Sequence, residues 1–218
     1  MSRRSEVLAE MGLSPIWRVR SSPGSAPAEK MESAVGWTEL KQAVPACKAC
    51  SLHQSRTQTV FGVGDENADW LLVGEAPGAE EDRLGDPFVG QAGKLLDNML
   101  AAIGLSRREN VYIANVLKCR PPGNRNPEPD EVAKCTPFLR VQIDLIRPKL
   151  IVAMGRFAAQ TLLNTDATIA SLRGRVHAYA GVPLIVTYHP AYLLRNLPDK
   201  SKAWADLVFA TKTMASLS

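Results

Sequence analysis

Four cysteines in the sequence have the spacing of a metal-binding site. Cys47 and Cys50 form a C-x2-C pair, 68 residues separate this pair from Cys119, and 15 residues separate Cys119 from Cys135. A C-x2-C pair can place two thiolates on one metal atom, and the second pair can complete a four-sulfur site. On spacing alone an iron–sulfur cluster, a zinc site and unrelated buried thiols are all open. Because the first three cysteines lie in polar loop sequence, a metal centre is favoured over buried thiols.

A second group of candidate residues follows predicted strands. Glu75 comes directly after a buried apolar strand, Asn115 stands at the end of another, and His189 comes after a third. The carboxyl ends of parallel strands meet at one edge of a sheet, where ligands bind. An acid, an amide and an imidazole at one edge therefore indicate an active site. The glycine-containing turn at residues 74–78 is not a phosphate-binding loop, because neither nucleotide-binding glycine motif follows the strand.

Three loop features are ambiguous when taken singly. Residues 118–126 are basic and broken by proline and glycine, so this loop is either a solvated surface or a contact to nucleic acid. The net charge of +4 is too mild to decide between them. Phe88 stands in a loop between a proline and a glycine. This position favours a packing role for its ring over a role as the surface on which a ligand stacks. Leu193 and Leu194 are apolar residues on a turn, a position from which side chains can wedge between stacked bases.

The elements that must position these residues alternate between short apolar strands and helices of about 10–15 residues. Strands are predicted at residues 70–74, 111–116, 150–154 and 183–187. Helices are predicted at residues 33–44, 92–103, 130–146, 156–163 and 202–214, with one further helical turn at 106–109. This alternation predicts an α/β fold of three layers, with a central, mostly parallel four-stranded sheet between two layers of helices.

The chain of 218 residues is expected to form one folded domain with an N-terminal extension. Residues 1–32 are predicted to be a short helix and a flexible linker, because residues 21–27 are all serine, proline, glycine or alanine. Residues 33–218 are predicted to be the domain. No apolar run reaches the roughly 20 residues of a membrane span, and the N-terminus lacks the apolar core of a signal peptide. We therefore expect a soluble, cytoplasmic protein.

Four motifs together resemble those of a known family. They are Gly74-Glu75-Ala76-Pro77-Gly78, Asp86-Pro87-Phe88-Val89-Gly90-Gln91-Ala92-Gly93, Asn115-Val116-Leu117-Lys118-Cys119-Arg120-Pro121-Pro122 and His189-Pro190-Ala191-Tyr192-Leu193-Leu194-Arg195. In this order and spacing, and with the four cysteines, the chain is similar to the family 4 uracil-DNA glycosylases, the iron–sulfur branch of that superfamily. The resemblance extends from about Cys47 to the C-terminus and leaves residues 1–32 outside.

The resemblance implies a monofunctional DNA-repair enzyme. Such an enzyme flips uracil out of single- or double-stranded DNA and hydrolyses its N-glycosidic bond, leaving an abasic site. The resemblance also implies a [4Fe–4S] cluster held by Cys47, Cys50, Cys119 and Cys135. We expect a monomer that acts on DNA in the cytoplasm, at the nucleoid in a prokaryote.

The resemblance further implies roles for single residues. Uracil would stack on Phe88, Asn115 would read the base edge, and His189 would hydrogen-bond O2, where negative charge develops. The uracil-binding residues are then Glu75, Ala76, Phe88, Asn115 and His189, and the catalytic residues are Glu75, Glu81 and His189. The DNA-binding residues are expected to be Lys118, Arg120, Arg125, Leu193, Leu194 and Arg195.

The sequence departs from other families of the superfamily at Ala76, where those families carry a water-activating aspartate. A methyl group cannot act as a base, so the carboxylate that orients the water would be Glu75, Glu81 or Asp82, with Glu75 favoured. The alternative role for Glu81 is to fill the space beside C5 of uracil and exclude the methyl group of thymine.

Two other functions are alternatives to excision of uracil. The first is a non-catalytic iron–sulfur module that binds nucleic acid, and the second is a four-cysteine zinc protein that processes nucleotides. A module that only binds has no need of both Asn115 and His189 at one edge. Metal content and visible absorbance separate iron from zinc.

Overall fold

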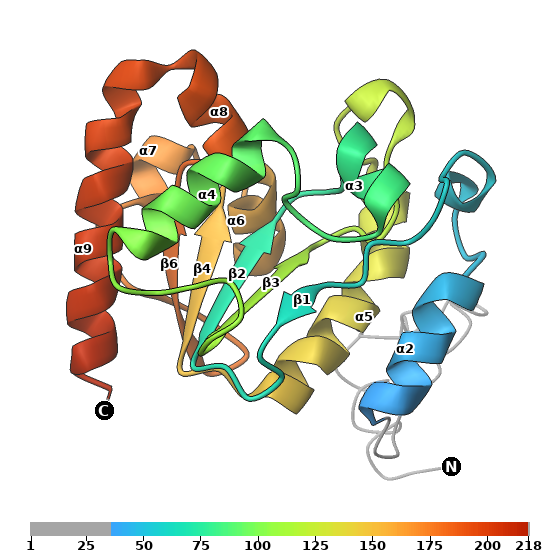
Figure 1. The fold of residues 1–218 in the computed structure, drawn as a ribbon, viewed down its shortest axis with the longest axis horizontal. Helices are drawn as coiled ribbons and strands as arrows, with labels where there is room; N and C mark the ends of the chain where they lie inside the picture. Colours follow the sequence, from blue (N-terminus) through green and yellow to red (C-terminus); the bar gives the residue numbers. More distant parts are fainter. Residues whose placement is uncertain (1–35, 218) are drawn as a thin grey trace, which may run out of the picture. The chain divides into compact units, whose positions relative to one another are not determined.

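The fold is a six-stranded sheet with helices on both faces (Figure 1). The computed structural model describes residues 36–217. The strand order across the sheet is β1-β3-β2-β4-β6-β5. The four central strands run parallel, and they are β3 (Val111–Asn115), β2 (Trp70–Gly74), β4 (Leu150–Met154) and β6 (Val182–Thr187). The predicted α/β class with a mostly parallel sheet is confirmed.

Two short edge strands enlarge the sheet from the four strands expected to six. β1 (Val63–Gly64) pairs antiparallel with β3, and β5 (His177–Tyr179) pairs antiparallel with β6. The side chains of these edge strands are half-buried or exposed, so neither strand has the apolar run of a central strand. A strand of two or three residues is also too short to show a period in the sequence.

The helices divide into five that were predicted and several shorter ones that were not. The predicted helices are present with shifted ends as α2 (Trp37–Ala46), α4 (Gln91–Ala101), α5 (Pro129–Ile146), α6 (Arg156–Leu163) and α9 (Lys200–Ala215). The unpredicted ones are α3 (Ala79–Leu84), α7 (Ile169–Leu172), α8 (Pro190–Arg195) and the 3-10 helices η1 (Ser51–Gln54), η2 (Pro122–Asn124) and η3 (Leu197–Asp199). The helical turn predicted at residues 106–109 was wrong, because Ser106 and Glu109 form an isolated antiparallel bridge.

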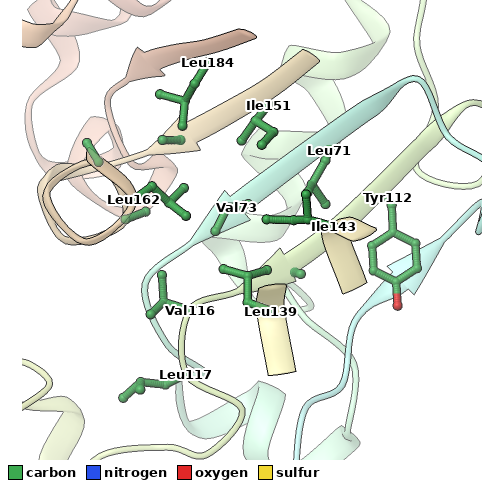
Figure 2. Packing of buried hydrophobic residues seen from close by; sticks show 14 of the residues in the cluster. Leu71, Val73, Tyr112, Val116, Leu117, Leu139, Ile143, Ile151, Leu162 and Leu184 are labelled. Atoms are coloured by element: carbon green, nitrogen blue, oxygen red, sulfur yellow. The ribbon is translucent and has the colours of Figure 1, made fainter. Parts of the chain in front are cut away.

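Side chains alternate along each central strand, so the core is divided into two clusters, one on each face of the sheet. Leu71 and Val73 of β2 pack toward α5, α6 and α7, whereas Trp70 and Leu72 pack toward α4 and α9. Figure 2 shows the first of these clusters, in which Leu139 of α5 lies close to β2. Burying one large apolar side chain contributes about 1.5–3 kcal/mol. The two clusters therefore hold the sheet as a rigid platform for the segments that leave it.

The carboxyl ends of the parallel strands are level with one another. Gly74 pairs with Asn115 across β2 and β3, and Met154 pairs with Thr187 across β4 and β6. The segments that follow these four strands therefore leave the sheet at one edge. That edge is where the sequence places its candidate catalytic residues.

The predicted helix and linker at residues 1–32, and the boundary placed after them, lie outside the described residues. Between residues 36 and 217, no helix combines the length and the apolar character that crossing a membrane requires.

Candidate active site

A cleft of about 740 Å³ lies at the carboxyl edge of the sheet. Residues that follow β2, β3, β4 and β6 form its walls. The predicted uracil-binding residues all line it, namely Glu75, Ala76, Phe88, Asn115 and His189. The further predicted site residues that line it are Glu81, Arg125 and Arg195.

Asn115 offers a buried acceptor to the cleft. It is the last residue of β3 and is 2% exposed. Its Oδ1 is buried and has no hydrogen-bond partner among the described residues. A buried acceptor left unpaired costs about 1–3 kcal/mol, so the site is built for a ligand that donates a hydrogen bond. Gly74 leaves room for this side chain, because a Cβ there would lie 2.3 Å from Asn115 Oδ1.

Phe88 is held at the cleft in an unusual backbone conformation. Its φ is 55°, in the left-handed region that bulky residues rarely adopt. Arg107 secures this conformation by donating to the carbonyl oxygens of Pro87 and Phe88, each at 2.8 Å. At Gly93 a Cβ would lie 1.7 Å from the Phe88 carbonyl oxygen, so the helix start approaches this loop closely. The Phe88 ring stacks on the ring of His189, with centroids 5.4 Å apart.

Glu81 is engaged on both carboxylate oxygens. Oε2 accepts from the N–H of Gly78 at 3.1 Å, and Oε1 accepts from the N–H groups of Val89 and Gly90 at 2.9 and 3.1 Å. Glu81 therefore caps α3 and holds the loop that carries Phe88. Glu81 therefore positions other residues. Because both of its oxygens already accept hydrogen bonds, these contacts weigh against the expected role of Glu81 as the catalytic base.

The two other carboxylates in this region differ in what they face. Asp82 is buried and accepts from the N–H of Thr57 with both oxygens, at 3.0 and 3.1 Å, and it does not line the cleft. Glu75 lines the cleft and is half-buried, and its carboxylate has no hydrogen-bond partner in the described part of the chain. Burial raises the pKa of Glu75, and the nearby charge of Arg156 lowers it. Of the three candidates, only Glu75 has a carboxylate free to meet a water.

His189 has one defined tautomer. Its Nδ1 accepts a hydrogen bond from the backbone N–H of Ala191 at 3.2 Å, as the N-cap of α8. Because a backbone N–H only donates, the ring proton must be on Nε2. Burial, together with the nearby charge of Arg195, lowers the pKa of His189 to about 4, with the charge of Glu81 opposing this. At neutral pH the ring is therefore uncharged, with Nε2–H as a donor.

The lowered pKa of His189 predicts a loss of stability in acid. The pKa is about 4 in the folded protein and about 6.5 when the chain is unfolded, so the unfolded chain takes up the proton first. The neutral His189 ring therefore contributes up to about 3 kcal/mol to the free energy of unfolding above pH 6.5, and this contribution is lost as the pH falls toward 4. In His189→Gln, the melting temperature should fall less than in the wild type between pH 7 and 4.5. Equal falls in the two proteins would contradict the assignment.

Lys118 does not face solvent, so its predicted contact with the DNA backbone was wrong. It is 1% exposed. Its Nζ donates to the backbone oxygen of Asn115 at 2.9 Å and to Oε1 of Gln142 at 2.6 Å. Burial lowers its pKa to about 8, with the Cys135 thiol opposing this. The side chain therefore points into the protein beneath the cleft.

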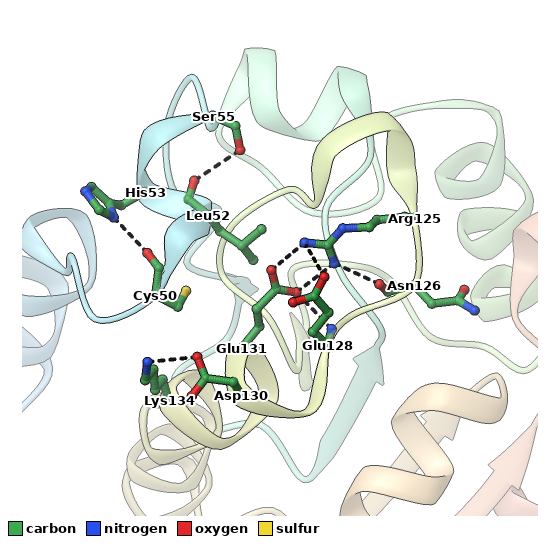
Figure 3. Close-up of polar contacts among 10 residues, drawn as sticks. All are labelled: Cys50, Leu52, His53, Ser55, Arg125, Asn126, Glu128, Asp130, Glu131 and Lys134. Carbon is green, nitrogen blue, oxygen red and sulfur yellow. Dashed lines mark hydrogen bonds and ion pairs between the residues drawn. The ribbon is translucent and has the colours of Figure 1, made fainter.

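The other two basic residues of this loop are braced near its surface. Figure 3 shows the guanidinium of Arg125 turned back toward Glu128 and Glu131, which it contacts at 3.3 and 2.6 Å. Nε of Arg120 donates to Oδ1 of Asn124 at 2.7 Å. Both side chains are half-buried, and Arg125 lines the cleft. Two carboxylates therefore offset the charge of Arg125 at the cleft, whereas Arg120 is held by a neutral amide.

The two leucines of α8 have different environments. Leu193 is 1% exposed and packs in the cluster of Tyr188 and Ala203, so its predicted role as a wedge between bases was wrong. Leu194 is 41% exposed and is free to contact a partner. Arg195, the last residue of α8, is exposed and lines the cleft.

The cleft also contains residues that the sequence analysis did not single out. Arg156 and Phe157 begin α6 directly after β4, and Tyr188 and Tyr192 stack with ring centroids 5.1 Å apart. Arg156 could have been found by the rule that identified Glu75, because it too follows a parallel strand. The tyrosine pair flanks His189 in the sequence, but only the tertiary structure shows that it lines the cleft.

The four cysteines line one small cavity beside the basic loop. Cys47 follows α2, Cys50 precedes η1, and Cys135 lies in α5. The N–H of Lys118 donates to Sγ of Cys135 at 3.2 Å. Segments that are far apart in the chain therefore meet at this cavity, as the spacing predicts.

Four thiolates can hold either a zinc ion or an iron–sulfur cluster. Within residues 36–217, no three cysteine, histidine or carboxylate side chains are placed to hold one metal ion. Burial raises the pKa of the Cys119 thiol, and raises that of Cys135 to about 11. Protons must therefore leave these thiols when metal binds.

The chain is similar to known proteins of one superfamily. The family model described as "Uracil DNA glycosylase superfamily" matches residues 61–208. A type-4 uracil-DNA glycosylase of Archaeoglobus fulgidus is 50% identical over 164 residues, which cover 72% of this chain and 82% of the relative. A type-4 uracil-DNA glycosylase of Thermotoga maritima is 46% identical over 159 residues, with the same two coverages. A type-5 uracil-DNA glycosylase of Pyrobaculum aerophilum is 36% identical over 149 residues, covering 61% of this chain and 66% of the relative.

Proposed function

Because the chain belongs to the type-4 uracil-DNA glycosylases of the uracil DNA glycosylase superfamily, we propose that its cleft takes up a uracil flipped out of DNA and that its residues hydrolyse the bond between base and deoxyribose. The chain is a uracil-DNA glycosylase, a hydrolase of N-glycosyl bonds that acts on uracil-containing DNA in repair. The observation that carries the mechanism is the unpaired Oδ1 of Asn115 in the same cleft as the Nε2–H of His189.

Asn115 and Phe88 supply recognition of the base. The buried Oδ1 of Asn115 accepts from N3–H of uracil, and the amide nitrogen donates to O4. Cytosine carries no proton on N3, so it would leave Oδ1 unpaired at a cost of about 1–3 kcal/mol. The ring of Phe88 stacks on the base, which contributes about 1–3 kcal/mol. These gains offset the free energy of a few kcal/mol that flipping the base out of the duplex requires.

The variant Asn115→Asp tests this recognition. The carboxylate keeps an acceptor and loses the donor to O4, so excision of uracil should fall at least about tenfold, the cost of an unmade buried hydrogen bond. Excision of cytosine should become detectable, because the carboxylate oxygen that replaces the amide nitrogen can accept from the 4-amino group of cytosine. Both rates are measured on matched oligonucleotides. Asn98→Asp, which adds the same charge at an exposed position of α4, is the control. Unchanged uracil activity with full rejection of cytosine would show that Asn115 does not face the base.

His189 acts on the leaving group. Breaking the bond between C1′ and N1 leaves negative charge on uracil, much of it on O2. Nε2–H of His189 donates to O2, and this hydrogen bond strengthens as the charge develops. The uncharged ring is suited to this task, because its proton stays on the enzyme while the anion departs.

Glu75 orients the water that completes the reaction. The sugar carries positive charge once the base has left, and a carboxylate close by both stabilises this charge and accepts a proton from water. Glu75 lines the cleft and its carboxylate has no hydrogen-bond partner in the described residues, whereas Glu81 holds the turn and the Phe88 loop. Ala76 lines the cleft beside Glu75 and contributes no side-chain chemistry.

Contacts with DNA are assigned to residues near the mouth of the cleft. Arg125 and Arg195 line the cleft and Arg120 lies in the same loop as Arg125, so these three arginines would contact phosphates, and the exposed side chain of Leu194 would fill the gap left by the flipped base.

The four cysteines Cys47, Cys50, Cys119 and Cys135 would hold a [4Fe–4S] cluster. When bound, the cluster supplies cross-links between segments and no electron transfer, because hydrolysis of a glycosidic bond is not a redox reaction. The shared cavity supports one metal centre for all four cysteines, and the likeness to type-4 uracil-DNA glycosylases supports a cluster over a single zinc ion.

Incubation with a uracil-containing oligonucleotide followed by alkali tests the proposed function. Alkali should cleave the strand at the uracil position only after incubation with the protein, and a matched thymine oligonucleotide should stay intact. Binding without cleavage would instead indicate a non-catalytic module. Iron, sulfide and zinc are measured on the same preparation, and zinc without iron would overturn the cluster.

A further inference from the structure

Two cations at the thiol cavity have no carboxylate partner. Lys118 is 1% exposed, and Arg56 is half-buried. Neither forms an ion pair within the described residues, and no carboxylate lines the cavity. Lys134, which also lines the cavity, differs from both because it is exposed and pairs with Asp130 at 2.8 Å.

Uncompensated buried charge is costly, so an anionic group is expected next to these two cations. A buried charge is normally paired with an opposite charge or bound to a metal centre. Nη1 of Arg56 donates to Sγ of Cys119 at 2.9 Å, and Nη2 donates to the carbonyl oxygens of Pro45 and Cys47 at 2.8 and 2.9 Å. Four thiolates around an iron–sulfur core would carry a net negative charge close to these two cations, since both residues line the cavity.

Lys118 also reaches the residue that reads the base. Its N–H donates to the Cys135 sulfur, while its Nζ donates to the backbone oxygen of Asn115 at 2.9 Å. The second acceptor of Nζ, Gln142, is fully buried, and its own Nε2 donates to the carbonyl oxygen of Phe61. One buried side chain therefore connects the cavity wall with the end of β3.

We propose that Lys118 is a positioning residue that balances the charge of the filled thiol cavity and, through the backbone of Asn115, fixes the amide that reads uracil. The inference rests on the proposed cluster. Arg56 balances the same charge from the opposite segments without contacting Asn115. Filling the cavity therefore affects base recognition through Lys118, although the cluster takes no part in the chemistry.

Three variants separate the two tasks of Lys118. Lys118→Met removes both the charge and the hydrogen bond to Asn115. Arg56→Met removes a charge from the same cavity and leaves the hydrogen bond to Asn115 in place. Lys134→Met, the matched control, removes an exposed lysine that already has a carboxylate partner.

Cluster stability and base binding are the two measurements. Iron content and the rate at which visible absorbance is lost in air report the first. Inhibition by free uracil, expressed per iron-loaded protein, reports the second. Lys118→Met and Arg56→Met should both lose absorbance faster than the wild type. Only Lys118→Met should bind uracil more weakly, at least about tenfold, the effect expected for one hydrogen bond to a charged group. Lys134→Met should match the wild type in both.

The outcomes distinguish this inference from the proposed function. Wild-type protein without iron would overturn the cluster itself. Iron-loaded Lys118→Met with wild-type uracil binding would overturn the positioning role. If Lys118→Met yields no folded protein, Lys118→Arg takes its place, since it keeps the charge but cannot reproduce the two hydrogen bonds of a lysine. That variant should retain iron and bind uracil weakly, and loss of iron from it would overturn the charge balance.

Discussion

Replacing His189 with alanine should lower the rate of uracil excision about a hundredfold or more, the reduction typical of removing one donor to a developing charge. The donor is Nε2–H, because Nδ1 is occupied by the backbone N–H of Ala191. With a pKa of about 4, the ring is uncharged at neutral pH, so the missing contribution is a hydrogen bond and not a full positive charge. Single-turnover rates on a uracil-containing oligonucleotide measure the effect.

Binding of the product separates chemistry from folding in this variant. Affinity for abasic DNA should change far less than the excision rate, because the DNA backbone is bound by other residues. His177→Ala is the matched control, since His177 lies in the edge strand β5 and outside the cleft. A wild-type rate in His189→Ala would remove this residue from the mechanism.

Replacing Cys135 with alanine should remove iron and weaken the fold and DNA binding together. Cys119 and Cys135 bracket the segment that carries Arg120 and Arg125, so a cluster bound to both clamps this segment against the part of the chain that carries Cys47. Loss of a structural metal centre removes several kcal/mol, which should lower the melting temperature by at least about 10 °C. Freed from the clamp, the arginines should neutralise fewer phosphates.

The salt dependence of DNA binding reports how many phosphates the protein neutralises. The slope of log affinity against log salt should become shallower by about one for each phosphate that is no longer neutralised. Thr136→Ala, the next residue along α5, controls for a small change in the same helix, because Thr136 does not line the cavity. A Cys135→Ala protein that lacks iron but keeps the wild-type melting temperature and slope would show that the cluster is no clamp.

The fold class and three chemically active residues of the cleft could be predicted from the amino-acid sequence alone. The apolar strands could be recognised in the sequence because successive side chains such as Leu71 and Leu72 must be buried on opposite faces of a parallel sheet. Glu75, Asn115 and His189 could be placed together because the carboxyl ends of parallel strands share one edge. The cysteines could be grouped by spacing, although the choice of iron over zinc rested on family resemblance.

Other features depend on the direction of side chains, which residue type and spacing do not reveal. Lys118 looks like a surface cation in a basic loop, yet the loop turns it inward onto Asn115 and Gln142. Leu193 and Leu194 are adjacent and alike, but the rotation of about 100° per residue in α8 buries one and exposes the other.

The roles of the carboxylates and of the imidazole were also decided by tertiary contacts. Glu81 is occupied by backbone N–H groups of a loop that follows it by eight and nine residues, which leaves Glu75 to face the cleft. The tautomer of His189 depends on one hydrogen bond that forms only because α8 starts at that residue. The sequence gives the type of each residue. Its hydrogen-bond partners and its burial arise only when the chain packs, and these decide which chemistry the residue can perform.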